Sequence, residues 1–395
     1  MTSSSVEDFL EHVRTPLNAC SLESLPASIQ LDGEDERVWP LMLGCYELDE
    51  DQGQRRGRLD LYAVAIPKDQ SDIRLGEPTN ILGEIEESSG ILDGKWYQRQ
   101  TNNNQNELYY ATAHASGEVI VHKVEKTSTS RQSSSSPLTA SRVGSSSSAY
   151  ESELCLALSW DLNPLPDSTR IISTYSNGQV AIHQVNFLGN EVQLIEQNRW
   201  DAHKIFQSPA EVWSACFTSD PNIVLTGGDE GYLKIWNLLA GTTQPMQVLK
   251  NHFQAGVTVL SPHPRRQHLV ACGSYDETVS LLDLRSLSES QPKLLCHSEP
   301  LGGGMWRIKW HPIDDEYLLL GAMHGGCRVV KVDGIELIGE GGGEVKMQIQ
   351  QEFTKHKSMA YGADWLVSER LGSDRVQAAV SCSFYDRAMY LWRVN

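Results

Sequence analysis

The chain has 395 residues, 40% hydrophobic and 21% charged, a composition that supports a large buried core and excludes disorder throughout the chain. Its 33 lysine and arginine residues against 51 aspartate and glutamate residues give a formal net charge of −18, which argues against nucleic acid or an anionic lipid surface as a ligand. The opening stretch MTSSSVEDFLEHVR is acidic where a secretory signal is basic and apolar, and no apolar run is long enough for an integral membrane segment, so we expect a cytoplasmic protein.

Cysteine and histidine spacing gives no indication of a metal site. The eight cysteines are scattered without a CxxC pair, and no HExxH sequence occurs. Thiols distributed in this way behave as small apolar side chains in a reducing compartment. We therefore expect free cysteines and no metal or other cofactor.

In chain order, the first predicted element is a short strand at about residues 6–16. After it, a pattern of small residues, a turn and an alternating strand recurs seven times. The copies are GRLDLYAVAI from Gly57, ASGEVIVHKV from Ala115, SNGQVAIHQV from Ser176, TGGDEGYLKIW from Thr226, GSYDETVSLL from Gly273, MHGGCRVVKV from Met323 and SCSFYDRAMYLW from Ser381. Their turns lie 46 to 62 residues apart, which fits four-stranded blades of about 40 to 45 residues with inserted loops. We predict an all-β fold in which residues 1–395 form a single seven-bladed β-propeller.

Two segments depart from the repeat. The last copy ends directly after its third strand, so we expect the strand at about 6–16 to complete the last blade and to cover its open edge. Residues 127–149 are dominated by serine and contain few large apolar side chains. Such a composition cannot offset the entropy of ordering, and we predict a disordered loop between the second and third blades.

Polar residues recur at equivalent positions of the copies. Histidines precede inner strands and aspartates occupy the turns before third strands: His203, His252, His356, Asp276 and Asp386. With Trp236 and Trp392 at the ends of third strands, this pattern resembles the WD-repeat family. The resemblance implies a network in which histidine, serine or threonine, the turn aspartate and tryptophan are hydrogen-bonded in series. Glu230 stands where the repeat usually has aspartate, which puts the network of that blade in doubt.

Aromatic and acidic residues are expected to meet at one rim of the ring, because inner strands converge on the axis. The residues concerned are Trp213, Trp306, Tyr361, Trp365, Tyr275 and Tyr385, with the carboxylates of Asp276, Asp364 and Asp386. Rings and carboxylates around one funnel suit a quaternary ammonium group. For any single tryptophan, a packing role in the core is the competing interpretation.

The segment LGGGMWRIKWHP contains glycine and arginine residues that the formation of a blade does not by itself require. Gly302, Gly303 and Gly304 allow close approach of a ligand or present backbone N–H groups to a developing negative charge, and Arg307 follows where side chains begin to line the channel. His324 occupies a turn position that holds aspartate in other copies and can titrate near neutral pH. A flexible connection and an ordinary turn residue are the structural alternatives.

Several longer strings resemble one particular family. They are AHKIFQSPAEVWSACF from Ala202, GGDEGYLKIW from Gly227, SPHPRRQHLVACGSYDETVSLLDLR from Ser261, GGGMWRIKWHP from Gly302, HKSMAYGADW from His356 and CSFYDRAMYLW from Cys382. In this order they resemble the diphthine methyl ester hydrolase family, the WD-repeat component of diphthamide biosynthesis. The resemblance implies that the partner is translation elongation factor 2 carrying methylated diphthine, and that the methyl ester is hydrolysed to diphthine and methanol. It also implies a trimethylammonium group on the substrate, and we expect the chain to act as a monomer.

The catalytic candidates are His324, Arg307, Asp276 and Asp386. The substrate-binding candidates are Gly302, Gly303, Gly304, Trp306, Trp213, Tyr275, Tyr361, Asp364, Tyr385 and His356. In the favoured mechanism His324 activates water, Arg307 and the glycine amides hold the oxyanion, and an aspartate orients the base or faces the ammonium. No GxSxG sequence occurs, which disfavours a serine esterase of the α/β-hydrolase type.

Two alternatives stay open from the residues alone. A nucleophile beside a histidine would replace activated water, with Cys272, Ser274, Cys382 and Ser383 as candidates. A non-catalytic scaffold that only assembles proteins would leave the ester intact. Turnover separates the enzyme from the scaffold.

Overall fold

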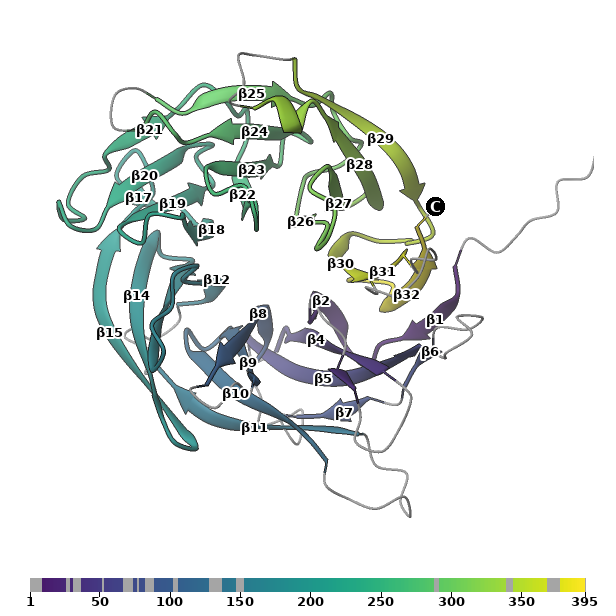
Figure 1. The fold of residues 1–395 in the computed structure, drawn as a ribbon. Helices are drawn as coiled ribbons and strands as arrows, with labels where there is room; N and C mark the ends of the chain where they lie inside the picture. The colour runs from purple at the N-terminus through teal and green to yellow at the C-terminus, as the bar shows by residue number, and fades with distance from the viewer. Residues whose placement is uncertain are drawn as a thin grey trace, which may run out of the picture.

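The computed structural model describes residues 9–25, 29–30, 37–51, 53–66, 74–76, 78–81, 89–101, 106–127, 137–146, 153–287, 291–338, 344–367 and 377–394. Within these residues, seven sheets surround a central axis, and the first strand of each sheet lies closest to that axis (Figure 1). The predicted seven-bladed β-propeller is confirmed. No helix in the described part of the chain is long and apolar enough to cross a membrane.

In blades two to six the strands follow the order of the chain from the axis outward. Blade one contains β2 (Asn18–Ser24), β3 (Ile29–Gln30), β4 (Arg37–Asp49), β5 (Gln54–Ile66), β6 (Arg74–Leu75) and β7 (Thr79–Asn80). Blade two contains β8 (Ile91–Gln100), β9 (Asn106–His114), β10 (Val119–Lys126) and β11 (Leu138–Ser145). Blade three contains β12 (Cys155–Trp160), β13 (Ser168–Tyr175), β14 (Gln179–Leu188) and β15 (Glu191–Asp201). A hairpin of β16 (Lys204–Ile205) and β17 (Ser208–Pro209) precedes blade four.

Blades four to six have the same arrangement, and blade seven takes its outer strand from the start of the described chain. Blade four contains β18 (Val212–Phe217), β19 (Ile223–Gly228), β20 (Leu233–Asn237) and β21 (Gln247–Leu249), and blade five contains β22 (Val257–Pro262), β23 (Leu269–Ser274), β24 (Val279–Asp283) and β25 (Lys293–His297). Blade six contains β26 (Arg307–Trp310), β27 (Tyr317–Gly321), β28 (Cys327–Asp333) and β29 (Lys346–Phe353). Blade seven contains β30 (Ala360–Val367), β31 (Gln377–Ser383), β32 (Ala388–Arg393) and β1 (Glu11–Arg14). A 3₁₀ turn, η2 (Ile335–Leu337), follows β28.

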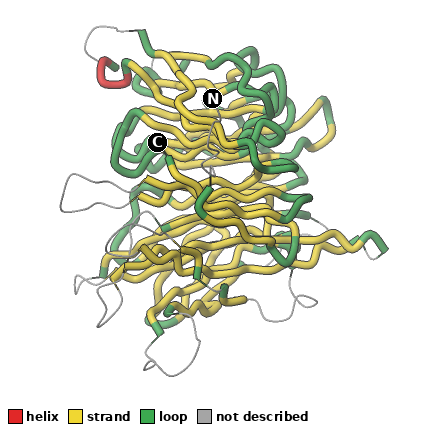
Figure 2. Tube along the Cα trace, turned by 90° about the vertical axis from the view of Figure 1, so that its right-hand side faces the viewer, coloured by secondary structure: helices red, strands yellow, loops and turns green. Residues whose placement is uncertain are grey.

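Blades pack face against face, which explains why their middle strands are apolar on both sides. Every residue of β19, with the sequence IVLTGG, is buried, and the same holds for LVACGS in β23. A strand covered on both faces has a continuous run of apolar and small residues in place of strict alternation. Figure 2 shows the strands crossing the ring between two faces that carry the turns. We call the face where the inner strands begin the top face; it also carries the turns at 229–232 and 275–278.

The two ends of the described chain meet in blade seven. Strand β1 pairs antiparallel with β32, so that Glu11 lies opposite Leu391 and Arg14 opposite Ala388. The backbone N–H of Thr15 continues the ladder by donating to the carbonyl of Arg387 at 2.8 Å. The pairing covers the edge of β32 that would otherwise expose unpaired backbone groups.

The serine-rich segment 127–149 corrects one prediction. Residues 138–145 form β11, the outer strand of blade two, so a disordered loop is wrong for this part. The reason is that an outer strand needs only one partner ladder and one buried anchor, which β10 and the fully buried Leu138 supply. Residues 128–136 and 147–149 lie outside the described residues.

The polar network implied by the WD-repeat resemblance is present in blade four, where Glu230 takes the aspartate position. His203 contacts Oε1 of Glu230 through Nδ1 and Oγ1 of Thr226 through Nε2, both at 2.7 Å. Trp236 completes the series by donating to Oγ1 of Thr226 at 2.9 Å. The longer glutamate side chain therefore closes the network, and the doubt about this blade is removed.

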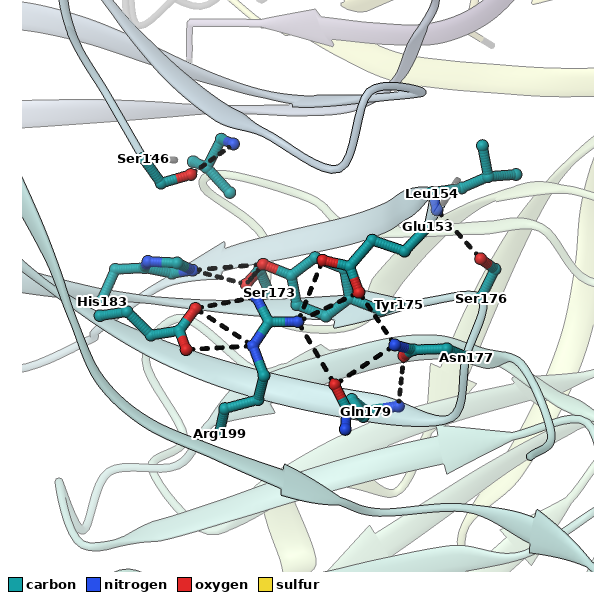
Figure 3. Close-up of polar contacts among 12 residues, drawn as sticks. Ser146, Glu153, Leu154, Ser173, Tyr175, Ser176, Asn177, Gln179, His183 and Arg199 are labelled. Atoms are coloured by element: carbon teal, nitrogen blue, oxygen red, sulfur yellow. Dashed lines mark hydrogen bonds and ion pairs between the residues drawn. The ribbon is translucent and has the colours of Figure 1, made fainter. Parts of the chain in front are cut away.

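Blade three has a different set of polar contacts at the equivalent position (Figure 3). Arg199 of β15 reaches Glu153 at 3.2 Å, and its guanidinium lies over the ring of Tyr175 at 4.1 Å. His183 occupies the tryptophan position and contacts Oγ of Ser173 at 2.8 Å. Burial lowers the pKa of His183 to about 4, so the ring is neutral at physiological pH. An arginine and carboxylate pair thus replaces the histidine-centred network in this blade.

Candidate active site

A cavity of about 230 Å³ lies at the mouth of the central channel on the top face. Its wall is contributed mainly by the starts of inner strands from several blades. The lining residues are Cys20, Tyr46, Arg55, Leu92, Leu154, Leu156, Ala157, Trp213, Thr258, Tyr275, Trp306, Arg307 and Tyr361. Because these residues come from every part of the chain, the cavity exists only when the ring is assembled.

Aromatic rings form one side of the cavity, and Trp306 is at their centre. Its ring centroid lies 5.7 Å from that of Trp213, 6.0 Å from Tyr275 and 5.0 Å from Tyr361. The indole N–H of Trp213 donates to Oδ1 of Asp229 at 2.9 Å, which places a carboxylate beside the rings. Ring faces with a nearby negative charge attract a cation that is too large or too weakly hydrated to need hydrogen bonds.

Two nitrogen donors of this wall have no hydrogen-bond partner among the described residues. They are Nε1 of Trp306 and Nε of Arg307, and both atoms are buried. An unsatisfied buried donor costs free energy, so such atoms are uncommon unless a ligand or water completes them. Both residues line the cavity, so a ligand with acceptor atoms, such as a carbonyl oxygen, is what these donors could take there.

Arg307 is held against the cavity by a buried carboxylate. Its Nη2 lies 2.9 Å from Oδ1 of Asp93, whose side chain is 2% exposed. Asp93 also accepts from Lys95 at 2.8 Å and from the backbone N–H of Leu158 at 3.2 Å. Burial alone would raise the pKa of Asp93, but Arg307 and Lys95 outweigh it and hold that pKa below its usual value. Asp93 therefore stays ionised and fixes the guanidinium.

Three further charged side chains fill the channel behind this pair. Glu23 contacts Lys95 at 2.7 Å and also contacts Lys309, whose Nζ lies 3.2 Å from Oδ2 of Asp364. Burial raises the pKa of Asp364, which Lys309 only partly offsets. The carboxyl groups of Glu23, Asp93 and Asp364 thus face the basic groups of Lys95, Arg307 and Lys309.

The thiols near the channel are poor nucleophiles. Cys20 lines the cavity, and burial raises the pKa of its thiol to about 12. Burial also raises the pKa of Cys272 and of Cys382 well above the usual value. Because the thiolate is the reactive form, the cysteine alternative of the sequence analysis receives no support.

The structure brings five of the sequence candidates together at the cavity: Trp213, Tyr275, Trp306, Arg307 and Tyr361. Asp364 lies behind them in the ion-pair network. Tyr385 is on the top face with 69% of its surface exposed, outside the lining of the cavity.

The turn aspartates and His356 belong to the blades themselves. Asp276 accepts from the backbone N–H of Gln254 at 2.7 Å and from the hydroxyl of Thr278 at 2.6 Å. Asp386 accepts from the N–H of Lys357 at 2.8 Å, while His356 contacts Ser381 and Ser383 at 2.8 and 2.7 Å. None of these three candidates lines the described cavity, and each has hydrogen-bond partners within its own blade, in accordance with the structural interpretation of the repeat.

The three glycines are accounted for by close packing. A Cβ atom on Gly303 would lie 2.1 Å from the carbonyl oxygen of Ala322, and one on Gly304 would lie 3.1 Å from the ring of Tyr275. Gly302 has a φ of 87°, in the left-handed region that favours glycine. These residues lie outside the cavity lining, and Gly304 supports it by allowing Tyr275 to approach.

Sequence reasoning missed the residues that hold Arg307. Glu23, Asp93 and Lys95 lie on the inner strands of blades one and two, in NACSLES and ILDGKW. Charged residues inside otherwise apolar inner strands were the available signal, since a buried charge in a strand requires a partner. Asp229, at the turn of blade four, was missed because Glu230 was assigned to the aspartate position of that turn.

His324 lies in the turn between β27 and β28 and is exposed, and it does not line the described cavity. Its role as the base stays a prediction from the sequence. From its position we expect that His324→Ala keeps turnover within about twofold of the original protein, because only groups within hydrogen-bond reach of the reacting atoms act as general bases. Steady-state kinetics check this. Loss of turnover at an unchanged melting temperature would restore His324 to the mechanism.

The comparisons with known proteins agree with this geometry. The family model WD domain, G-beta repeat matches residues 197–237 and 243–283. A chain in the solved structure titled Crystal Structure of Mitotic Checkpoint Complex is 14% identical, with a TM-score of 0.57, and the match covers 100% of this chain and 97% of that one. Fold and channel together define a WD-repeat β-propeller with a cavity at its top face.

Sequence similarity over most of the chain identifies one family within this class of WD-repeat β-propellers. A protein of Dictyostelium discoideum named diphthine methyltransferase homolog is 30% identical, over 88% of this chain and 91% of its own length. Diphthine methyltransferase of Homo sapiens is 32% identical over 84% of this chain and 66% of its own length, and that of Saccharomyces cerevisiae is 25% identical over the whole of both. The chain belongs to the diphthine methyltransferase family, which confirms the family resemblance of its longer strings.

Proposed function

We propose that the protein hydrolyses the methyl ester of methylated diphthine on translation elongation factor 2, with diphthine and methanol as products. The observation that carries this proposal is a cavity that combines aromatic rings, a neighbouring carboxylate and the guanidinium of Arg307 in one wall. The family relationship supports diphthine as the chemical group concerned.

The aromatic side of the cavity suits the trimethylammonium group. A quaternary ammonium has no N–H to donate, so ring faces and a diffuse negative charge are its natural surroundings. Trp213, Tyr275, Trp306 and Tyr361 supply the rings, and Asp229 supplies the charge through its contact with Trp213. The cation of the substrate would therefore lie on the side of Asp229, away from the guanidinium of Arg307.

The donor side suits the ester. In the proposed complex the carbonyl oxygen accepts from Arg307 and Trp306, which polarises the carbonyl carbon for attack by water. The new C–O bond forms, the oxyanion gains charge, and the bond to the methoxy group breaks to release methanol and one proton. Donors fixed before the reaction stabilise this charge without reorganisation, and the adjacent ammonium of the substrate adds to the effect. The carboxylate product would pair with Arg307.

The reaction class is tested by mass spectrometry and methanol detection. The purified protein is incubated with elongation factor 2 bearing methylated diphthine, without a methyl donor. We expect loss of the ester methyl group, release of one methanol per factor, and many turnovers per protein molecule. A parallel incubation contains the unmethylated factor and S-adenosylmethionine, because the relatives are named methyltransferases.

Each arm of this experiment can contradict the proposal. A gain of a methyl group in the second incubation, with no loss in the first, would show methyl transfer. Stoichiometric binding with an intact ester would show a non-catalytic scaffold, the function for which β-propellers are commonly used.

A further inference from the structure

The hairpin between blades three and four presents an apolar side chain at its tip. Strands β16 and β17 pair Lys204 with Pro209 and Ile205 with Ser208, and all residues from 204 to 209 are exposed. Phe206 is 96% exposed, and no other large apolar residue of the described chain is as exposed. An aromatic side chain in water forgoes the burial that normally stabilises it.

The conformation of Phe206 is also unfavourable. Its φ is 56°, while the next residue in the two-residue loop is not in the left-handed region. Hairpin turns with a positive φ at this first position normally contain glycine there. A phenylalanine therefore makes the turn less stable than glycine would, and contributes no packing in return. A role outside the folded monomer accounts for both observations.

The base of the hairpin is rigid. The backbone N–H of His203 donates to the carbonyl of Gly178 at 3.0 Å, and that of Ala210 donates to the carbonyl of His203 at 3.2 Å. The imidazole of His203 is fixed in turn by Glu230 and Thr226. A side chain presented from such a base loses little conformational freedom on binding, which favours affinity.

The hairpin lies on the same face of the ring as the cavity, because its base bonds to the turn at Gly178. The chain runs from Pro209 directly into β18, where Trp213 forms part of the cavity wall. A cavity of about 230 Å³ has room for one modified side chain, so the remainder of a protein substrate must lie on the top face. Asp229 lies at the mouth of the cavity, where its carboxylate accepts from the indole N–H of Trp213, and the whole chain has a net charge of −18. The surface fits a partner that is basic around the modified residue.

We propose that Phe206 is an anchor that inserts into an apolar pocket on the folded substrate protein, on the surface of that protein that meets the top face when the modified side chain enters the cavity. The inference rests on the proposed function, because it takes the substrate to be a folded protein. It adds a specificity determinant for the protein surface that is separate from the cavity for the modified side chain.

Phe206→Gly is the informative variant, because it removes the ring and relieves the backbone at once. With folded elongation factor 2 bearing methylated diphthine, we expect KM to rise about tenfold and kcat to stay within about twofold. With a short peptide carrying the same side chain, both constants should be unchanged. The melting temperature should be equal or higher, an outcome that a structural role of Phe206 would not produce.

Two further variants serve as controls. Phe206→Trp should restore the KM for the folded factor, since it returns a large ring. Leu239→Ala removes a side chain that is 79% exposed in the turn after β20, on the opposite face, and should change neither substrate. An unchanged KM of Phe206→Gly for the folded factor, or an equal rise for factor and peptide, would overturn the docking role.

Failure of the proposed function is recognised separately. If the original protein hydrolyses neither substrate, the affinity of the folded factor for the original protein and for Phe206→Gly is measured by biolayer interferometry. A loss of about tenfold in the variant would support docking without hydrolysis. Equal affinities would overturn the docking inference as well.

Discussion

Replacing Arg307 with methionine is expected to lower kcat for ester hydrolysis about 10²- to 10³-fold, the loss typical of removing one donor to an oxyanion. The guanidinium lies at the cavity wall with an unpartnered Nε and with Nη2 fixed by Asp93 at 2.9 Å. Because this donor strengthens its contact as negative charge develops, kcat should fall much more than KM rises. Stopped assays of methanol release at saturating substrate measure the effect.

The chain offers a matched control for this variant. Lys309 lies two residues further along β26 and takes part in the same buried network through Glu23 and Asp364, but it does not line the cavity. Lys309→Met should destabilise the fold by leaving buried carboxylates with fewer partners, while a folded fraction keeps its kcat. Arg307→Lys, which keeps the charge and loses the planar fork, should recover part of the activity. Equal kcat losses in Arg307→Met and Lys309→Met would assign Arg307 a structural role only.

The ring of blades could be predicted from the sequence because its signal is local and repeated. Each copy combines a turn with an alternating strand, as in GYLKIW of blade four, and seven copies at a regular spacing leave few architectures. The chain order of strands within a blade is also local, since neighbouring strands are joined by short turns. The outer strand β11 escaped because its sequence, LTASRVGS, has no alternation to detect.

The cavity was predicted in part, and the missing part depends on geometry across the ring. Trp213 and Trp306 were placed at the wall because both stand at the start of inner strands. The partner of Arg307 is Asp93, which belongs to a different blade, and the pairing depends on how far each strand reaches into the channel. The spacing of residues in the sequence does not indicate how far each strand reaches into the channel.

For the turn aspartates, the sequence predicted a place at the cavity that the structure does not give them. Asp276 and Asp386 are at the top face, as expected, but their carboxylates accept hydrogen bonds from their own turns and from the loops that precede the inner strands, and they do not line the cavity. Direction reverses from one residue to the next in a strand and changes again in a turn, so proximity to the rim does not establish access to the cavity. Asp229 differs because the indole of Trp213 connects it to the aromatic wall.

Substitution of Trp306 separates the two roles that its indole is proposed to have. The ring contacts Trp213, Tyr275 and Tyr361, and the N–H is a buried donor without a partner in the described chain. Trp306→Phe keeps a ring face for the ammonium and loses the donor, so kcat should fall about 10²-fold with little change in KM.

Trp306→Leu loses both the ring and the donor, and KM should rise about tenfold in addition, as expected for removal of one desolvated ring from a cation site. Binding of the tetramethylammonium ion, measured by its competition against the substrate, reports on the ring alone and should weaken only in the leucine variant. A phenylalanine variant that keeps full kcat would remove the indole N–H from the stabilisation of the oxyanion and leave Arg307 as its donor. A leucine variant with unchanged competition would show that the cation does not bind against this ring, and the ester would then have to enter the cavity in another orientation.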